Sequence, residues 1–180
     1  GTDDDEEQLF PEQCSEAAPT SSPLSGGDHE HLRVHVSVGS YHCLATAASF
    51  GAAHASLSGI PAVLAQPPLG DRELLNASML RGGLVLMDRG VVTFVEKARR
   101  AQAAGAAAVM FINTDDKAYV PLGLEGDGDV RLPVICIQQM HGEQIKLLLQ
   151  QSPGIKATVV YGDTASSSAG VLERVKVDAG

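Results

Sequence analysis

The sequence predicts an α/β (α+β) fold, in which a small curled mixed β-sheet or open barrel is flanked by two main helices. A strand, a helix and a second strand follow one another over 84–112, the βαβ arrangement of two parallel neighbouring strands. Before this unit, short apolar stretches alternate at the period of a strand, and after it another helix lies between two strands. This order of elements favours one sheet with helices packed against it.

The region before the βαβ unit contains short strands. Val34, Val36 and Val38 alternate with polar residues, as in a strand with one buried face, and the strand is expected to end at Gly39. Three less regular segments follow: a strand near 46–50, a short strand over 62–65 and one helical turn within 74–80.

The βαβ unit has the clearest pattern. A buried strand over 84–87 leads through the turn 88–90 into a helix over 93–104. Thr93 is a suitable N-cap for this helix, because Glu96 follows three residues later as in a capping box. Residues next to one another in the sequence therefore predict where the helix begins.

The helix over 93–104 is amphipathic. Phe94, Val95 and Ala98 fall on one face, which we expect to pack on the sheet. Lys97 falls on the opposite face, and we expect it to be solvated or to extend its charged end to solvent.

The remainder of the expected domain repeats strands and a helix around one long loop. The loop covers 114–129 and is polar and rich in Gly and Asp. The expected elements are a strand over 107–112, a strand over 132–137, a helix over 140–150 and a final strand over 155–161.

Composition divides the 180 residues into three parts. Residues 1–30 form an acidic tail rich in Pro, Ser and Gly, residues 31–162 form the domain, and residues 163–180 form a linker or a terminal strand. The tail carries much of the formal net charge of −9, so the domain is nearly neutral. Neither part has the basic surface that nucleic acids or anionic membranes require, and no apolar run is long enough to span a bilayer.

Metal, cofactor and catalytic motifs are not found in the sequence. The three cysteines are widely spaced without a CxxC pair, Cys136 lies in an apolar strand, and Cys14 with Cys43 is the pair to test for a disulfide. The turn after the strand over 84–87 has neither GxGxxG nor a Walker lysine, and GxSxG is absent. We therefore expect no cofactor and no metal, and a chain that is not itself an enzyme.

The region from Gly83 to Leu149 resembles the protease-associated (PA) domain family. That family couples an apolar strand, an Arg-Gly turn, a Phe and a Lys on the next helix, an Ala-Gly-Ala stop, a strand ending in Asn and a later Leu-Pro strand. The matching segments here are 83–90, 94–98, 101–106, 109–113 and 132–135, with His141-Gly142 where the family often has Asp-Gly. Many members have Cys-Ser-Phe after Arg-Gly, whereas this chain has Val92-Thr93-Phe94, so no disulfide forms from that turn.

The resemblance implies an accessory role. PA domains occur beside subtilisin-like proteases, metallopeptidases, sorting receptors and membrane-anchored ubiquitin ligases, usually facing a lumen or the exterior, and they lack catalytic residues. It implies a module that binds a peptide or protein segment in a sorting-receptor-like or membrane ubiquitin-ligase-like parent, with an adjacent catalytic, transmembrane or RING domain. The alternative is a regulatory insert that controls substrate access in a protease of the subtilisin-like or metallopeptidase type. A small free-standing hydrolase is a third, minor reading.

Candidate ligand-binding residues follow the two parallel strands. Asp88, Arg89 and Gly90 follow the first strand, and Asn113 and Asp115 follow the second. The carboxyl ends of parallel strands meet at one edge of a sheet, where α/β proteins commonly bind ligands. The alternative for each residue is a structural role in the turn that ends its strand.

The long loop and one sequon supply the other candidates. Tyr119, Glu125 and Asp127 lie in the loop, which we expect to be a recognition surface because long loops often carry function. Asn76 begins Asn-Ala-Ser, a glycosylation acceptor if the parent is secreted.

Overall fold

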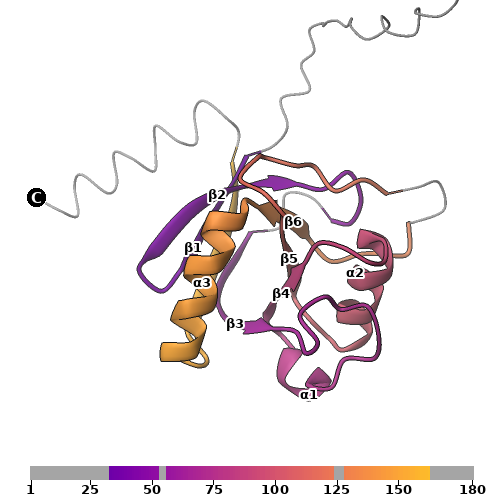
Figure 1. Cartoon of the computed structure of the whole chain (residues 1–180), viewed down its shortest axis with the longest axis horizontal. Helices are drawn as coiled ribbons and strands as arrows, with labels where there is room; N and C mark the ends of the chain where they lie inside the picture. Colours follow the sequence, from indigo (N-terminus) through magenta and orange to yellow (C-terminus); the bar gives the residue numbers. More distant parts are fainter. Residues whose placement is uncertain (1–32, 53–55, 124–127, 163–180) are drawn as a thin grey trace, which may run out of the picture. The chain divides into compact units, whose positions relative to one another are not determined.

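A computed structural model describes residues 33–52, 56–123 and 128–162. Within these ranges the chain forms a β-barrel with three helices (Figure 1). The expected tail, the residues after 162, Cys14, Glu125 and Asp127 lie outside the described residues. In chain order the elements are β1 (Arg33–Val38), β2 (Tyr41–Ala47), β3 (Leu57–Leu64), α1 (Ala77–Leu80), β4 (Leu84–Asp88), α2 (Phe94–Ala103), β5 (Ala108–Ile112), β6 (Val134–Ile137), α3 (Gln139–Gln151) and β7 (Lys156–Gly162).

The strands close into a barrel in the order β1-β2-β6-β5-β4-β3-β7. β3, β4, β5 and β6 are parallel neighbours, whereas the pairs that involve β1, β2 and β7 are antiparallel. The predicted βαβ unit is confirmed, because β4 and β5 are adjacent and parallel with Val85 opposite Val109. The predicted curled mixed sheet is also confirmed, and its closure comes from β1 pairing with β7, where Arg33 lies opposite Gly162.

Two early strands differ from their predicted ranges. β2 begins at Tyr41, directly after the turn at Gly39, where φ is +60°, so the strand lies earlier than the predicted 46–50. β3 starts at Leu57 and extends well before the predicted 62–65. In both strands small and polar residues interrupt the apolar pattern, so strand pairing decides the boundaries: β2 pairs with β1 across the turn from Tyr41, and β3 pairs with the distant β7 from Leu57.

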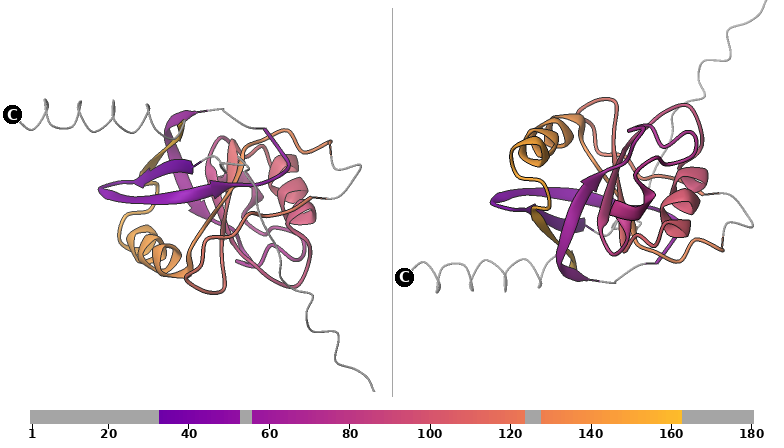
Figure 2. Two further views of the ribbon diagram at one scale, coloured as in Figure 1. Left: turned by 90° about the horizontal axis from the view of Figure 1, so that it is seen from above. Right: turned by 90° about the horizontal axis from the view of Figure 1, so that it is seen from below.

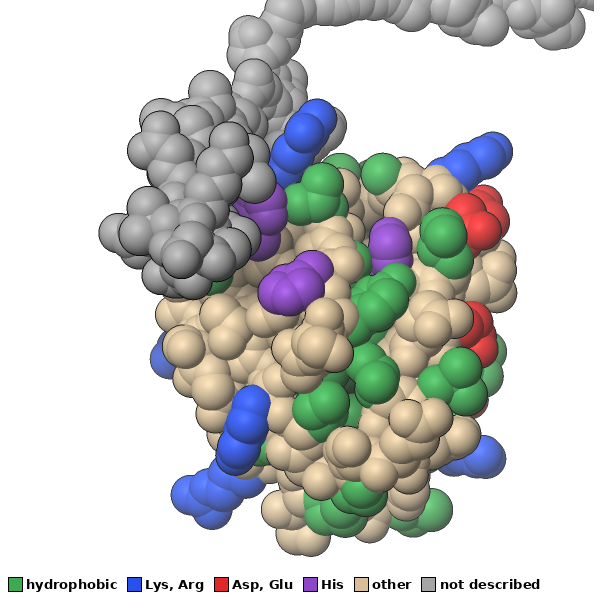
Figure 3. Space-filling model, turned by 90° about the vertical axis from the view of Figure 1, so that its left-hand side faces the viewer, with side chains coloured by type: hydrophobic (Ala, Val, Ile, Leu, Met, Phe, Trp, Pro, Cys, Tyr) green, Lys and Arg blue, Asp and Glu red, His purple; other side chains and the backbone are tan. Residues whose placement is uncertain are grey.

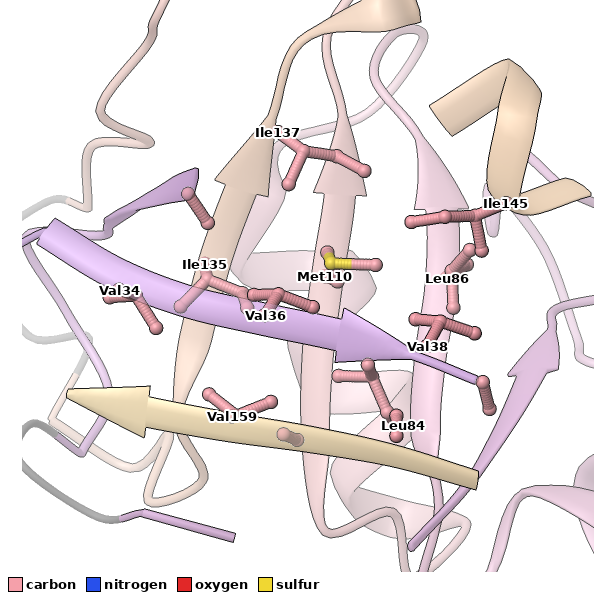
Figure 4. Packing of buried hydrophobic residues seen from close by; sticks show 14 of the residues in the cluster. Val34, Val36, Val38, Leu84, Leu86, Met110, Ile135, Ile137, Ile145 and Val159 are labelled. Carbon is pink, nitrogen blue, oxygen red and sulfur yellow. The ribbon is translucent and has the colours of Figure 1, made fainter. Parts of the chain in front are cut away.

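The barrel interior is filled by alternate side chains of its strands. Val34, Val36 and Val38 point inward from β1 toward Leu84 and Met110 (Figure 4). Ile145 of α3 joins this cluster and is fully buried, so α3 contributes directly to the interior core. Burying each such side chain contributes about 1.5–3 kcal/mol to folding.

A second core lies outside the barrel, beneath α2. Val85 and Phe111 point outward from β4 and β5 and belong to the same buried cluster as Val95 and Ala98 of the helix. Because β4, β5 and β6 are buried on both faces, they appear in the sequence as continuous apolar runs. Helices α2 and α3 lie on different sides of the barrel (Figure 2).

Candidate functional site

The carboxyl ends of β4 and β5 bring together several of the predicted site residues. Asp88 ends β4 opposite Ile112, and the backbone N–H of Arg89 donates to the carbonyl oxygen of Ile112 at 3.0 Å. Asn113 and Asp115 follow Ile112 on the neighbouring strand. At this edge β4 connects to α2 and β6 connects to α3, and the two helices lie on different sides of the barrel (Figure 2). Open α/β sheets bind ligands at the carboxyl ends of strands where the connections diverge in this way.

Arg89 joins the turn after β4 to the loop after β5. Its guanidinium donates to Asn113 Oδ1 at 2.8 Å and stacks over the Tyr119 ring, 3.9 Å from the ring centre. The Phe94 ring lies 5.7 Å away and is itself tilted against Tyr119. The guanidinium of Arg89 therefore forms its hydrogen bond and its ring contacts inside the domain, and aromatic rings cover its planar face.

The loop after β5 is ordered by its own side chains. Asn113 is buried and donates from Nδ2 to Asp115 Oδ1 at 3.0 Å and to the Lys117 carbonyl oxygen at 2.9 Å. Asp115 Oδ1 also accepts from the backbone N–H of Lys117 at 3.0 Å, an Asx-type arrangement. Asp116 Oδ1 accepts from the N–H of Met140 at 2.7 Å, which satisfies one free donor at the start of α3. These hydrogen bonds hold the start of the loop, residues 113–117, in one conformation against α3.

The turn between β4 and α2 presents a strained apolar tip. Gly90 has φ +128°, and Val91 has φ +76° with 75% of its surface exposed. A β-branched residue in the left-handed region is rare, because its Cβ substituents crowd the backbone at a cost of about 1–3 kcal/mol. Neither the exposure nor the conformation of Val91 was expected from the sequence pattern of the turn.

A small polar cavity lies beside Asp88. The Asp88 carboxylate forms an ion pair with Lys146 of α3, with Nζ 2.9 Å from Oδ1 and 3.1 Å from Oδ2. The cavity has a volume of about 210 Å³ and is lined by Asp88, Ile112, Asn113, Thr114, Gln139, Glu143 and Lys146. Sequence reasoning missed Lys146, because on the helix alone it resembles any solvated lysine.

Lys97 of α2 is bonded to the end of β4, and the prediction that it is solvated is wrong. The residue is fully buried, and Nζ donates to the backbone carbonyl oxygen of Asp88 at 2.5 Å. Burial lowers the pKa of Lys97 to about 8, although Asp88 and Asp71 oppose this shift. The Oδ1 atom of Asp71 is buried without a hydrogen-bond partner among the described residues.

The far end of the long loop is fixed on α2. Asp129 accepts two hydrogen bonds from Arg99, at 2.8 and 2.9 Å, and these bonds hold the pKa of Asp129 below its usual value. Gln102 donates to the Asp129 carbonyl oxygen at 2.9 Å. With 113–117 fixed at the other end, both ends of the expected recognition loop are attached to the domain.

The candidate residues for glycosylation and for a disulfide, Asn76 and Cys43, are buried or half-buried. Asn76 is only 7% exposed; Nδ2 donates to the Leu64 carbonyl oxygen, and Oδ1 accepts from the Gln66 N–H, both at 3.0 Å. Glycosylation of Asn76 remains a prediction, one that this geometry does not favour.

Cys43 is half-buried, and burial raises the pKa of its thiol to about 11. Its predicted pairing with Cys14 remains a prediction.

Metal-ligand clusters and membrane-spanning helices are not found among the described residues. In the ranges 33–52, 56–123 and 128–162, no three His, Cys, Asp or Glu side chains come together as metal ligands. None of the helices described is long and apolar enough to cross a membrane. Tyr41 Oη and His141 Nδ1 lie 2.7 Å apart, a titratable pair that the sequence did not suggest.

Comparison with known proteins gives a consistent family signal. A family model described as PA domain matches residues 35–145. The PRADC1-like protein of Drosophila melanogaster is 44% identical over 123 residues, which cover 64% of this chain and 63% of that protein. Signal peptide peptidase-like 2 of Arabidopsis thaliana is 34% identical over 80 residues, covering 43% of this chain and 15% of that protein.

The fold is shared with part of a solved peptidase. A zinc aminopeptidase from Bacillus subtilis superposes with a TM-score of 0.54 and 27% identity, covering 73% of this chain and 30% of that one. The match spans less than two thirds of the length of each of these three proteins.

Proposed function

The chain belongs to the PA domain family, and we propose that it is a non-catalytic module that binds a peptide or protein segment through the turn 88–93. The family assignment confirms the resemblance found in the sequence. The binding role and the position of the site are the proposal, and they are supported by the geometry at the carboxyl ends of β4 and β5.

The observation that carries this proposal is the conformation of Val91. An exposed apolar side chain in a left-handed conformation costs stability, and such strain is usually kept where it serves a function. Arg89 and Asn113 hold the base of the turn rigidly, so a partner meets a prearranged apolar tip with little loss of entropy. In this proposal Asp88, Arg89, Gly90, Asn113, Asp115 and Tyr119 position the contact surface.

The parent protein and its location follow as part of the proposal. A sorting-receptor-like or membrane ubiquitin-ligase-like parent would place the module in a lumen or outside the cell.

A second candidate function is a regulatory insert beside a peptidase domain. An apolar groove of about 410 Å³ runs between β3, α1 and α3, with Leu149 and Pro61 among its lining residues. Met79 of α1 lies in the groove lining, and Leu75, just before α1, is 81% exposed. Exposed apolar surface of this kind suits contact with an adjoining domain. Peptidase motifs beside the domain in the parent sequence would favour this function, whereas a transmembrane helix with a RING or sorting tail would favour the first.

Peptide selection followed by mapping tests the first function. The full chain, immobilised, is used to select binders from a phage-displayed library of random seven-residue peptides, and a selected peptide is titrated into isotope-labelled chain by NMR. We expect shift changes at 88–93 and 113–119. Val91→Asp should weaken binding at least about tenfold, whereas Leu75→Asp, an equally exposed apolar position, should change it less than about twofold.

Two results would contradict the proposal. Failure to select any binding peptide would argue against a peptide-binding module. Shift changes confined to 61–64 and 149–154, with loss of binding in Met79→Asp, would move the site to the groove and favour the regulatory insert.

A further inference from the structure

The outer face of β7, β1 and β2 lacks a covering helix among the described elements. Helix α2 packs on the outward side chains of β4, β5 and β6, and α3 contributes Ile145 to the barrel interior. The inward side chains of β1 and β7, such as Val36 and Val159, are buried in the barrel. Their outward neighbours are half-buried or exposed, which leaves a three-stranded surface open to a partner.

The strand register defines this surface, which we term the β7-β1-β2 face. Val160, His35 and Leu44 lie side by side across the three strands, and Thr158, Ser37 and His42 form the adjacent row. Arg33 lies at one end of β1, and Lys156 lies at the opposite end of the face, at the start of β7.

The charge of the face is opposite in sign to that of the chain. β1, β2 and β7 contain no Asp or Glu, although the chain has 22 acidic and 13 basic residues. Arg33 and Lys156 are exposed, and neither forms an ion pair with another residue in the part of the chain that the structure describes. Figure 3 views the side that lies at the left of Figure 1, where histidine and apolar side chains gather and acidic side chains appear only along one edge.

An apolar cavity adjoins the face at β2. Its volume is about 300 Å³, and its lining includes Arg33, Leu44, Ala118 and Cys136. Leu44 is 48% exposed, so an apolar group entering the cavity would cover it. Thr46 Oγ1 donates to the carbonyl oxygen of Tyr119, which fixes the loop on the far side of the cavity.

We propose that the β7-β1-β2 face binds an extended acidic segment of a partner protein, with one apolar side chain of that segment in the cavity beside Leu44. Carboxylates of the segment meet Arg33 and Lys156, which have no acidic partner on these strands. Lys156 lies six residues before Gly162, the residue opposite Arg33, so the two cations are about 20 Å apart along the strands. A segment of about six or seven extended residues spans that distance.

The proposed face and the turn 88–93 share the loop after β5, because Ala118 lines the cavity and Tyr119 stacks on Arg89. The residues tested differ: Arg33, Leu44 and Lys156 belong to the face, and Val91 belongs to the turn. The acidic segment can therefore be tested without any assumption about Val91.

Fluorescence anisotropy with two labelled peptides tests the proposal. The probe has seven residues with four Glu and one Leu, and the reference peptide has Gln in place of each Glu. The protein is the full chain, as wild type, as Arg33→Gln/Lys156→Gln and as Leu44→Ser. Arg72→Gln/Arg131→Gln is the matched control, because it removes two exposed positive charges outside the face.

The expected result is preferential binding of the acidic probe. Arg33→Gln/Lys156→Gln should weaken it about three- to tenfold and Leu44→Ser about fivefold, whereas the control should change it less than about twofold. Binding should also weaken as NaCl is raised, because exposed charges are screened.

Four results would overturn the proposal. These are no binding of the acidic probe at millimolar protein, equal binding of the Gln peptide, an equal loss in the control variant, and an unchanged affinity in Leu44→Ser. Tighter binding of single-stranded oligo-dT than of the acidic peptide would instead assign the face to phosphate backbones.

Discussion

The guanidinium of Arg89 lies 3.9 Å from the centre of the Tyr119 ring while it donates a hydrogen bond to Asn113 Oδ1. One side chain thereby connects the end of β4, the end of β5 and the loop that follows β5. The sequence predicts Arg89 as a ligand-binding residue, and in the structure its guanidinium is bonded to other residues of the site.

Arg89→Lys is expected to lower the free energy of unfolding by about 1–2 kcal/mol. Lysine keeps the charge but loses both the planar stacking on Tyr119 and the directed bond to Asn113. Urea unfolding followed by circular dichroism measures the change, with the exposed Arg72→Lys as the control. An unchanged midpoint together with lost peptide binding would mean that Arg89 contacts the ligand directly.

Lys97 should make stability rise with pH relative to a Lys97→Met variant. Its pKa of about 8 in the folded state lies below the ordinary value of 10.5, so between these pH values the unfolded chain binds more protons than the folded one. The free energy of unfolding of the wild type minus that of Lys97→Met should therefore increase by about 2–3 kcal/mol from pH 8 to pH 10.5, and it should be constant below pH 7. Urea titrations at one-unit intervals measure this difference, and a flat difference would show that Lys97 is not desolvated.

Gly142→Ala is expected to destabilise the domain by about 1–3 kcal/mol despite the better helix propensity of Ala. A Cβ at position 142 would lie 2.3 Å from Cγ2 of Ile112, since α3 packs closely against β5. Gly128→Ala is the control, because a Cβ there meets nothing within 4 Å. Ile112→Ala should partly rescue Gly142→Ala in a double-mutant cycle; additive losses would contradict the predicted clash.

Val91→Gly is expected to stabilise the domain by about 0.5–1 kcal/mol. Glycine adopts φ +76° without the strain that valine has there, and this gain exceeds its larger loss of entropy. Thermal unfolding gives the shift in Tm, and Val92→Gly should not stabilise. If Val91 is the contact tip, the more stable variant should bind selected peptides more weakly; a gain in both properties would remove the reason for the strained residue.

The sequence predicted best the elements whose signals are local. The βαβ unit was found because Thr93 and Glu96 mark the start of α2 and because both of its strands are continuously apolar; in the structure Glu96 N donates to Thr93 Oγ1 at 3.1 Å. Closure of the barrel was not predicted, since β1 and β7 are far apart in the chain and their pairing leaves no local signature.

In the candidate site, too, contacts between residues far apart in the chain were not predicted from the sequence. The placement of Asp88, Arg89, Asn113 and Asp115 at one edge followed from parallel strands, but their partners did not. Lys97 bonds to the carbonyl oxygen of Asp88 and lies near Asp71, whose neighbour Gly70 accepts a bond from Arg100 of α2. The pattern of one helix records neither contact. Loop residues outside the described ranges, Glu125 and Asp127, remain predictions.

The pairing of Arg33 with Gly162 has an architectural consequence. A chain that runs into the barrel at β1 leaves it at β7 from a point about 5 Å away, the spacing of neighbouring strands. A surface loop of a host protein can therefore accommodate the whole barrel with little displacement of its own anchors. By the same geometry, a short glycine-rich bridge between the first and last strands, with new ends opened at the β1–β2 turn, should yield a circular permutant that retains the fold.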